Sequence, residues 1–144
     1  MNDNARAFEA YVYATTEQLE QHQAGLDELR DTLIKRPLSF NEKSAAERSL
    51  QVITEVAIGC SKHFLKMCGK PVPSEARATI ECVYELTGII EPAIETMRGA
   101  VGMRNAIVHD YLNLDWSLLD RVLREGKYAD VVIYARAIAS RLLD

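Results

Sequence analysis

The sequence predicts an all-α fold, an up-and-down bundle of helices with one short extra helix packed across it. Apolar residues recur in steps of three and four over long stretches, which is typical of amphipathic helices. No segment shows the sustained period-two alternation of a half-buried strand. The few Gly and Pro residues, 7 and 4 among 144, cut the chain into helical pieces. With a hydrophobic content of 48%, the chain is long enough to bury its own core, and we expect one domain over residues 1–144.

The first long helix is predicted over residues 4–35, which contain no proline. Its apolar stripe is weakened by Thr15 and His22 and consists otherwise of Phe8, Val12, Leu19, Leu26, Leu29 and Leu33. The helix ends at Arg36, because a residue that precedes proline avoids the helical region of backbone conformation.

A second long helix is predicted to follow a capping box at Ser39 and Glu42, whose side chains can satisfy each other's free amides. Its apolar positions repeat with the same spacing: Ala46, Leu50, Ile53, Ala57, Cys60, Phe64 and Met67. Gly69 is expected to end this helix, and Pro71 prevents its continuation.

Two further helices are predicted from their end signals. Ser74 can cap a third helix that ends at Gly88. Pro92 fits the first turn of a fourth, which is expected to run to about Asp110.

The last two helices flank a glycine. Asp115 can cap a short fifth helix over residues 116–124, which Gly126 breaks. A final helix is expected to reach Leu142. Because the connections are short, neighbouring helices should be antiparallel.

Composition excludes several classes of protein. The net charge of −4 and the isoelectric point near 5.4 argue against binding nucleic acid mainly through bulk charge, although a local basic site remains open. Cys60, Cys68 and Cys82 form no C-x-x-C pair, so buried reduced thiols are expected rather than a disulfide framework or a zinc site. Neither a membrane span nor a signal peptide is visible, and we expect a cytoplasmic protein.

The familiar motifs for phosphate, dinucleotide and zinc-hydrolase chemistry are missing, as is the nucleophile elbow. The three histidines, His22, His63 and His109, lie too far apart in sequence to suggest a metal site. We therefore expect neither a metal nor a cofactor.

Reactive residue types concentrate between positions 103 and 111. Arg104 offers a permanent planar cation, and His109 can exchange a proton near neutral pH. Asn105 lies four residues before His109 and shares its helical face. Arg104 and His109 are about 140° apart on a regular helix. A site that uses both therefore needs a distorted helix end or a second copy of the helix across a dimer. From the residues alone, a surface Arg–Asp pair beside a core histidine is the simpler interpretation, and Tyr111 can be an aromatic anchor.

The string Arg104-Asn105-x-x-x-His109-x-Tyr111 resembles the R-x4-H-x-Y motif of HEPN-domain toxins of the HepT type. The resemblance covers about residues 40–143 and makes the motif fairly specific. It extends to the segments 47–55 through His63, Gly88-Ile89-Ile90, Met97-Arg98-Gly99 and Leu114-Asp115-Trp116. Many relatives carry an acidic residue where this chain has Gly59.

The resemblance implies a HEPN-like bundle and a metal-independent RNA endonuclease that acts as the toxin of a toxin–antitoxin pair, with tRNA as target. Arg104 and His109 would be catalytic and Asn105 supporting. The antitoxin would be a minimal MntA-like nucleotidyltransferase that silences the toxin by transferring AMP to Tyr111.

These residue types suit RNA cleavage without a metal. Histidine can take the proton of the 2′-hydroxyl or give one to the leaving 5′-oxygen, and arginine can neutralise charge on the phosphate. One histidine is few for both roles, and a two-fold homodimer would supply two sets. An AMP group on Tyr111 would block RNA by charge and volume.

Lys62, Lys66 and Lys70 repeat every four residues and could contact RNA phosphates, although a solvated helix face explains them equally well. Two other functions stay open. The chain could be a non-catalytic adaptor or partner subunit of a nucleotidyltransferase, or a plain dimeric helical domain.

Overall fold

The computed structural model describes the backbone of residues 3–109 and 111–144 and the side chains of residues 6–109 and 112–144. This part of the chain contains six α-helices and one 3-10 turn and no strand. They are α1 (Asp3–Lys35), α2 (Phe40–Met67), α3 (Ala76–Thr87), α4 (Ile94–His109), η1 (Tyr111–Asn113), α5 (Trp116–Glu125) and α6 (Tyr128–Arg141). The all-α prediction is confirmed.

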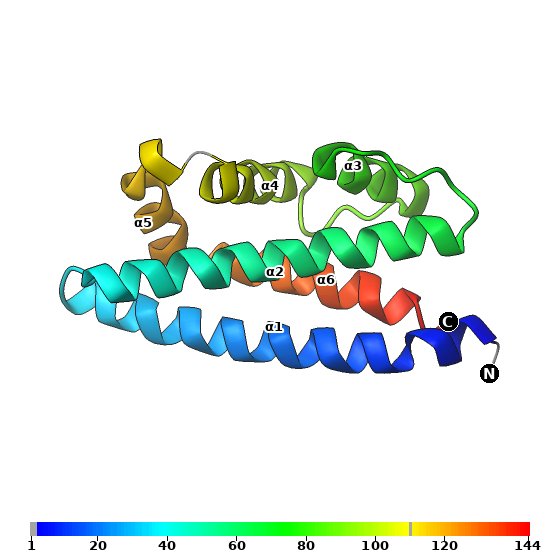
Figure 1. Cartoon of the computed structure of the whole chain (residues 1–144), viewed down its shortest axis with the longest axis horizontal. Coiled ribbons are helices and arrows are strands. Elements are labelled where there is room, and N and C mark those ends of the chain that lie inside the picture. Colours follow the sequence, from blue (N-terminus) through cyan, green and yellow to red (C-terminus); the bar gives the residue numbers. More distant parts are fainter. Residues whose placement is uncertain (1–2, 110) are drawn as a thin grey trace.

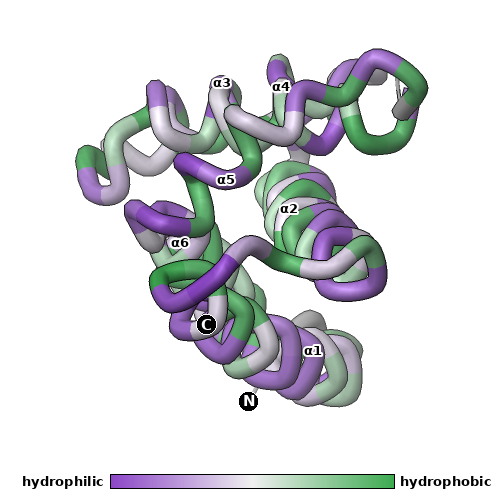
Figure 2. Tube along the Cα trace, turned by 90° about the vertical axis from the view of Figure 1, so that its left-hand side faces the viewer, coloured by the Kyte–Doolittle hydropathy of each residue, from purple (hydrophilic) through white to green (hydrophobic). Residues whose placement is uncertain are grey.

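In Figure 1, helices α1, α2 and α6 lie along the long axis of the molecule, and α2 runs opposite to α1. The short α5 is steeply inclined to them, and the two termini lie at the same end. Figure 2, which looks along the bundle, shows α2 between α1 and α4, with α6 beside it. Accordingly, α2 packs against α1, α3, α4 and α6. The predicted up-and-down arrangement with a crossing fifth helix is present.

The core is built on the apolar stripes that the sequence predicts. Leu19, Leu26 and Leu33 of α1 are buried. Most of the α2 stripe is buried as well, with Ile53 and Ala57 fully enclosed. Burial of these faces is the main source of stability.

A buried polar contact fixes α2 against α6. The hydroxyl groups of Ser61 and Tyr134 lie 2.6 Å apart. The Tyr134 ring stacks on Tyr84, with centroids 5.6 Å apart. The Tyr84 hydroxyl donates to the carbonyl of Pro92 at 2.7 Å. Burial raises the pKa of Tyr134 well above its usual value, so its hydroxyl stays neutral. These contacts fix the positions of α2, α3 and α6 relative to one another.

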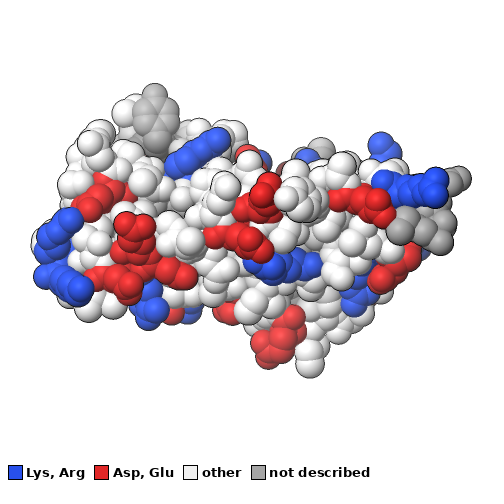
Figure 3. Space-filling view, turned by 90° about the horizontal axis from the view of Figure 1, so that it is seen from below, with Lys and Arg blue, Asp and Glu red and all other residues white. Residues whose placement is uncertain are grey.

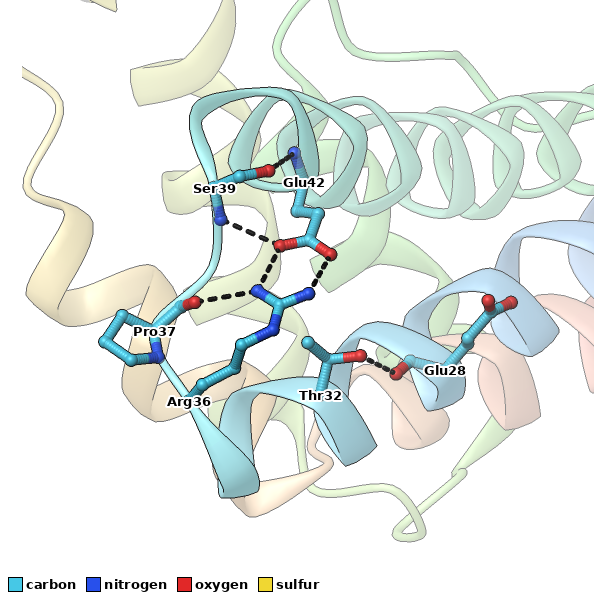
Figure 4. Close-up of polar contacts among 6 residues, drawn as sticks. All are labelled: Glu28, Thr32, Arg36, Pro37, Ser39 and Glu42. Carbon is cyan, nitrogen blue, oxygen red and sulfur yellow. Dashed lines mark hydrogen bonds and ion pairs between the residues drawn. The ribbon is translucent and has the colours of Figure 1, made fainter.

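The turn between α1 and α2 contains the predicted capping box (Figure 4). The Ser39 hydroxyl accepts from the backbone N–H of Glu42 at 3.2 Å, and the Ser39 N–H donates to the Glu42 carboxylate at 2.8 Å. Arg36 adds two hydrogen bonds to the same carboxylate, at 2.8 and 2.9 Å. Hydrogen bonds from Arg36, followed by that from the Ser39 backbone, lower the pKa of Glu42 to about 2. The start of α2 is therefore fixed by hydrogen bonds from Arg36, before the turn, and from Ser39, at its end.

Three of the other predicted helix caps are confirmed, at Gly88, Gly126 and Asp115. Gly88 and Gly126 cap α3 and α5 in the left-handed conformation, at φ of 72° and 69°. Asp115 accepts from the N–H of Ser117 and caps α5, as predicted.

Three local predictions are wrong. Ser74 does not cap α3, because the helix begins at Ala76 and its N-cap residue Glu75 makes no side-chain cap. Pro92 lies before α4 rather than in its first turn, with its carbonyl taken by Tyr84. Cys68 is exposed because it is the C-cap residue of α2, whereas Cys60 is buried.

We predict that Ser39→Ala lowers the free energy of unfolding by about 1 kcal/mol, because it removes the side-chain acceptor at the start of α2. Ser44→Ala is the matched control, since Ser44 is exposed within the same helix. It should change stability by less than about 0.5 kcal/mol. Urea denaturation measures both variants, and equal effects would show that the capping box does not anchor α2.

Candidate functional site

Helix α4 carries the cluster that the sequence singles out. Met97, Val101 and Met103 are buried and hold the helix on the rest of the bundle. Asn105 and His109, nearer the end of the helix, are exposed. Because α4 runs antiparallel to α2, its C-terminal end lies over the first half of α2 (Figure 1).

Arg104 makes two side-chain hydrogen bonds. Its Nε donates to the Glu55 carboxylate on α2 at 2.7 Å. Its Nη1 donates to the Asn105 side-chain oxygen at 2.6 Å. The side chain of Arg104 is 21% exposed and that of Glu55 is 42% exposed. The guanidinium therefore lies at the protein surface, on the seam between α2 and α4.

His109 is the last residue of α4 and is exposed, so it is not the core histidine of the alternative interpretation. The helix is continuous from Ile94 to His109, and no distortion of its end occurs within these residues. The two side chains thus keep their separation of about 140° around the helix axis. The first of the two ways to join Arg104 and His109 in one site, a distorted helix end, is therefore not seen in the described residues.

Two neighbours of His109 lie outside the described part of the structure. One is Asp110, so the structure does not test the predicted ion pair between Arg104 and Asp110. Among the described residues, Arg104 pairs with Glu55. The other is the side chain of Tyr111, whose backbone begins the turn η1 directly after α4.

The three predicted RNA-contacting lysines lie elsewhere. Lys62 and Lys66 are exposed on the face of α2 that carries Glu55, and Lys70 follows the helix. At 1.5 Å per residue, Lys62 and Lys66 lie about 10 and 16 Å beyond Glu55 along α2, away from His109. The structure thus places them on the same side of the bundle as Arg104 but does not bring them together with His109.

Charge is distributed unevenly over the surface. Figure 3 shows the face of the bundle that lies away from α3 and α4, where acidic side chains spread across the middle. Glu17, Glu20, Glu28 and Asp31 of α1 are exposed acids of the chain. Acids also lie near Arg104: Glu55 pairs with it, and Glu95 lines the same pocket.

The sequence analysis missed Glu55 as a site residue. It is 49 positions from Arg104, and only the packing of α4 on α2 brings the two together.

Gly59 lies close to Tyr11 of α1. A Cβ atom at position 59 would lie 3.0 Å from the Tyr11 hydroxyl, so that hydroxyl would have to shift by a few tenths of an ångström to admit a side chain. The Tyr11 ring also packs edge-on against His63, with centroids 4.6 Å apart. The packing of α1 on α2 therefore makes position 59 tight for any residue larger than glycine.

A pocket of about 340 Å³ lies between α2, α4, α5 and α6, and Arg104 is one of the residues that line it. Most of its lining is apolar, for example Met103, Leu118 and Val131. Asn105 and His109 are not among the residues that line it. It therefore does not join the groups of the cluster.

Two further properties bear on function. Within the residues that the structure describes, no three His, Cys, Asp or Glu side chains are grouped as metal ligands. None of the described helices has the length and hydropathy of a transmembrane span.

Two solved structures share this fold over nearly the whole chain. One is a toxin–antitoxin complex with AMP-PNP, with 16% identity and a TM-score of 0.71; the match covers 94% of this chain and 99% of that chain. The other is a tri-AMPylated HEPN toxin of Shewanella oneidensis in complex with an MNT antitoxin, with 17% identity and a TM-score of 0.74. This second match covers 95% of this chain and 99% of that chain, and it confirms the predicted HEPN-like fold.

No curated protein matches the chain. The model of the family described as ribonuclease HepT-like matches residues 12–138, which includes every helix that contributes to the cluster. The resemblance that the R-x4-H-x-Y string suggests is thus confirmed, and the chain belongs to the family of HepT-like ribonucleases.

Proposed function

We propose that this chain is a metal-independent RNA endonuclease that acts on tRNA as the toxin of a toxin–antitoxin system. The observation that carries the proposal is the exposed end of α4, where Arg104, Asn105 and His109 lie in a chain of a ribonuclease family. Arg104 and His109 are the proposed catalytic residues, and Asn105 supports Arg104 through the hydrogen bond to Nη1.

The chemistry needs a base, an acid and a cation. The 2′-hydroxyl of the RNA loses its proton and its oxygen attacks the adjacent phosphorus, while the 5′-oxygen leaves and takes up a proton. Histidine suits both proton transfers. The Arg104 guanidinium stabilises the charge that builds on the phosphate oxygens. The products are a 2′,3′-cyclic phosphate and a 5′-hydroxyl.

A two-fold homodimer would complete the site. The regular course of α4 turns His109 away from Arg104 of the same chain, so a facing α4 from a second copy would supply the missing group. Val108 and Leu112 are 37% and 84% exposed at this end of the molecule and offer an apolar contact for that copy. Two histidines would then serve as base and acid.

The proposed regulator is an MntA-like nucleotidyltransferase antitoxin that transfers AMP to Tyr111. The placement of η1 directly after His109 supports this choice of acceptor. A phosphate and an adenosine at this point would compete with RNA for Arg104 by charge and by volume. One structural neighbour, at 17% identity, is an AMPylated toxin in complex with its MNT antitoxin, which is consistent with this regulation.

One observation favours the alternative of a non-catalytic partner subunit. The positive charge of Arg104 is already opposed by the carboxylate of Glu55, which weakens long-range attraction of RNA. The same experiment decides between the two functions.

Expression of the unmodified chain should arrest bacterial growth, and the purified chain should cut tRNA in the presence of a chelator. Arg104→Ala and His109→Ala should each lower the cleavage rate by about 100-fold or more, because each removes a group that acts on the reacting phosphate. Arg136→Ala and His63→Ala are matched controls away from the end of α4 and should keep the activity. A harmless wild-type chain that leaves RNA intact would favour the non-catalytic alternative.

For the regulation, incubation with the cognate nucleotidyltransferase and ATP should add mass in multiples of one AMP. The added mass should disappear in Tyr111→Phe and persist in Tyr13→Phe, since Tyr13 is an exposed tyrosine of α1. Intact-protein mass spectrometry measures this. AMP that remains on Tyr111→Phe would place the acceptor elsewhere.

A further inference from the structure

We propose that Glu55 is the positioning residue of the site: it aims the Arg104 guanidinium at the RNA phosphate. This inference rests on the proposed function and adds to it a residue that lies outside the R-x4-H-x-Y motif.

The contacts of Arg104 define what the guanidinium can still bind. Arginine has five N–H donors. Glu55 takes the one on Nε, and Asn105 takes one on Nη1. In the described part of the chain, three N–H groups stay available, two of them on Nη2. A phosphate oxygen pair can therefore dock on the side of the guanidinium that Glu55 leaves open.

Stability does not account for this ion pair. Both side chains are partly exposed, and such pairs contribute little to the free energy of unfolding. A free arginine side chain, in contrast, samples many rotamers, and a displacement of about 1 Å at a reacting group can cost about 100-fold in rate. Two anchors from two elements, Glu55 on α2 and Asn105 on α4, remove this freedom before RNA binds.

Among the residues that the structure describes, neighbouring carboxylates do not make this contact. Position 59, one turn after Glu55, is occupied by the hydroxyl of Tyr11 and has no side chain. The nearby acids Glu81 and Glu95 pair with Arg98 instead. Glu55 is the acid of α2 that contacts the Arg104 guanidinium.

The role depends on an acceptor oxygen rather than on negative charge. Glutamine at position 55 keeps an oxygen that can accept from Nε, whereas alanine does not. A group that acts through Arg104 should therefore tolerate Glu55→Gln. A group that itself takes the proton of the 2′-hydroxyl should not, because an amide is no base.

The test compares wild type, Glu55→Ala and Glu55→Gln with unfractionated bacterial tRNA as substrate and a chelator present, between pH 5 and 9. Glu55→Ala should lower kcat by about tenfold or more, with a smaller effect on KM. Glu55→Gln should stay within about threefold of wild type, with an unchanged pH profile. Glu17→Ala, an exposed acid on α1, controls for loss of one charge, and thermal melting should show all variants folded.

Wild-type kcat in Glu55→Ala would overturn the proposal, and so would a Glu55→Gln variant as slow as Glu55→Ala. A second measurement does not depend on cleavage. The Nε–H resonance of Arg104 should report an ordered group in wild type and Glu55→Gln and a mobile one in Glu55→Ala. Equal mobility in all three would contradict the role of Glu55. Absence of cleavage by wild type with an ordered Arg104 would reject only the proposed function.

Discussion

Burial of the apolar face of α2 is the constraint on which the rest of the structure depends. This helix packs against α1, α3, α4 and α6, and its buried Ser61 joins α6 through Tyr134. Because the apolar positions face inward, the outer face of α2 is left polar and carries Glu55 and the exposed lysines. The same packing that makes the core thus presents a carboxylate to α4.

Helix α4 is buried along its first part and exposed at its C-terminal end. Three buried residues of its first ten positions anchor the helix, whereas Asn105 and His109 near its end are exposed. The cluster is small, and Arg104 in it is already paired with the carboxylate of Glu55. The proposed RNA site would therefore depend on a few directed hydrogen bonds at Arg104 rather than on a broad basic surface.

Local signals in the sequence predict most of the fold. The capping box at Ser39 and the glycines that end α3 and α5 act through neighbouring backbone groups, so each can be read from a few residues. Pro92 fails because a distant hydroxyl, that of Tyr84, takes its carbonyl. Arg104, Asn105 and His109 stand out as residue types, but the Glu55 contact spans 49 positions and exists only after the helices pack. The candidate residues on α4 can therefore be picked out from the sequence, whereas the ion-pair partner of Arg104 cannot.

One regular α4 does not aim both Arg104 and His109 at one phosphate, so the proposed site joins Arg104 of one copy with His109 of another. Mixing the purified Arg104→Ala and His109→Ala variants tests it most directly. In a mixed dimer, one intact Arg104 faces one intact His109, which keeps one of the two groups for proton transfer. The mixture should therefore cut tRNA faster than the sum of the two separate variants, although more slowly than wild type. Mixed dimers that form and remain as inactive as either variant alone would contradict the proposed pairing of Arg104 with His109 across the dimer.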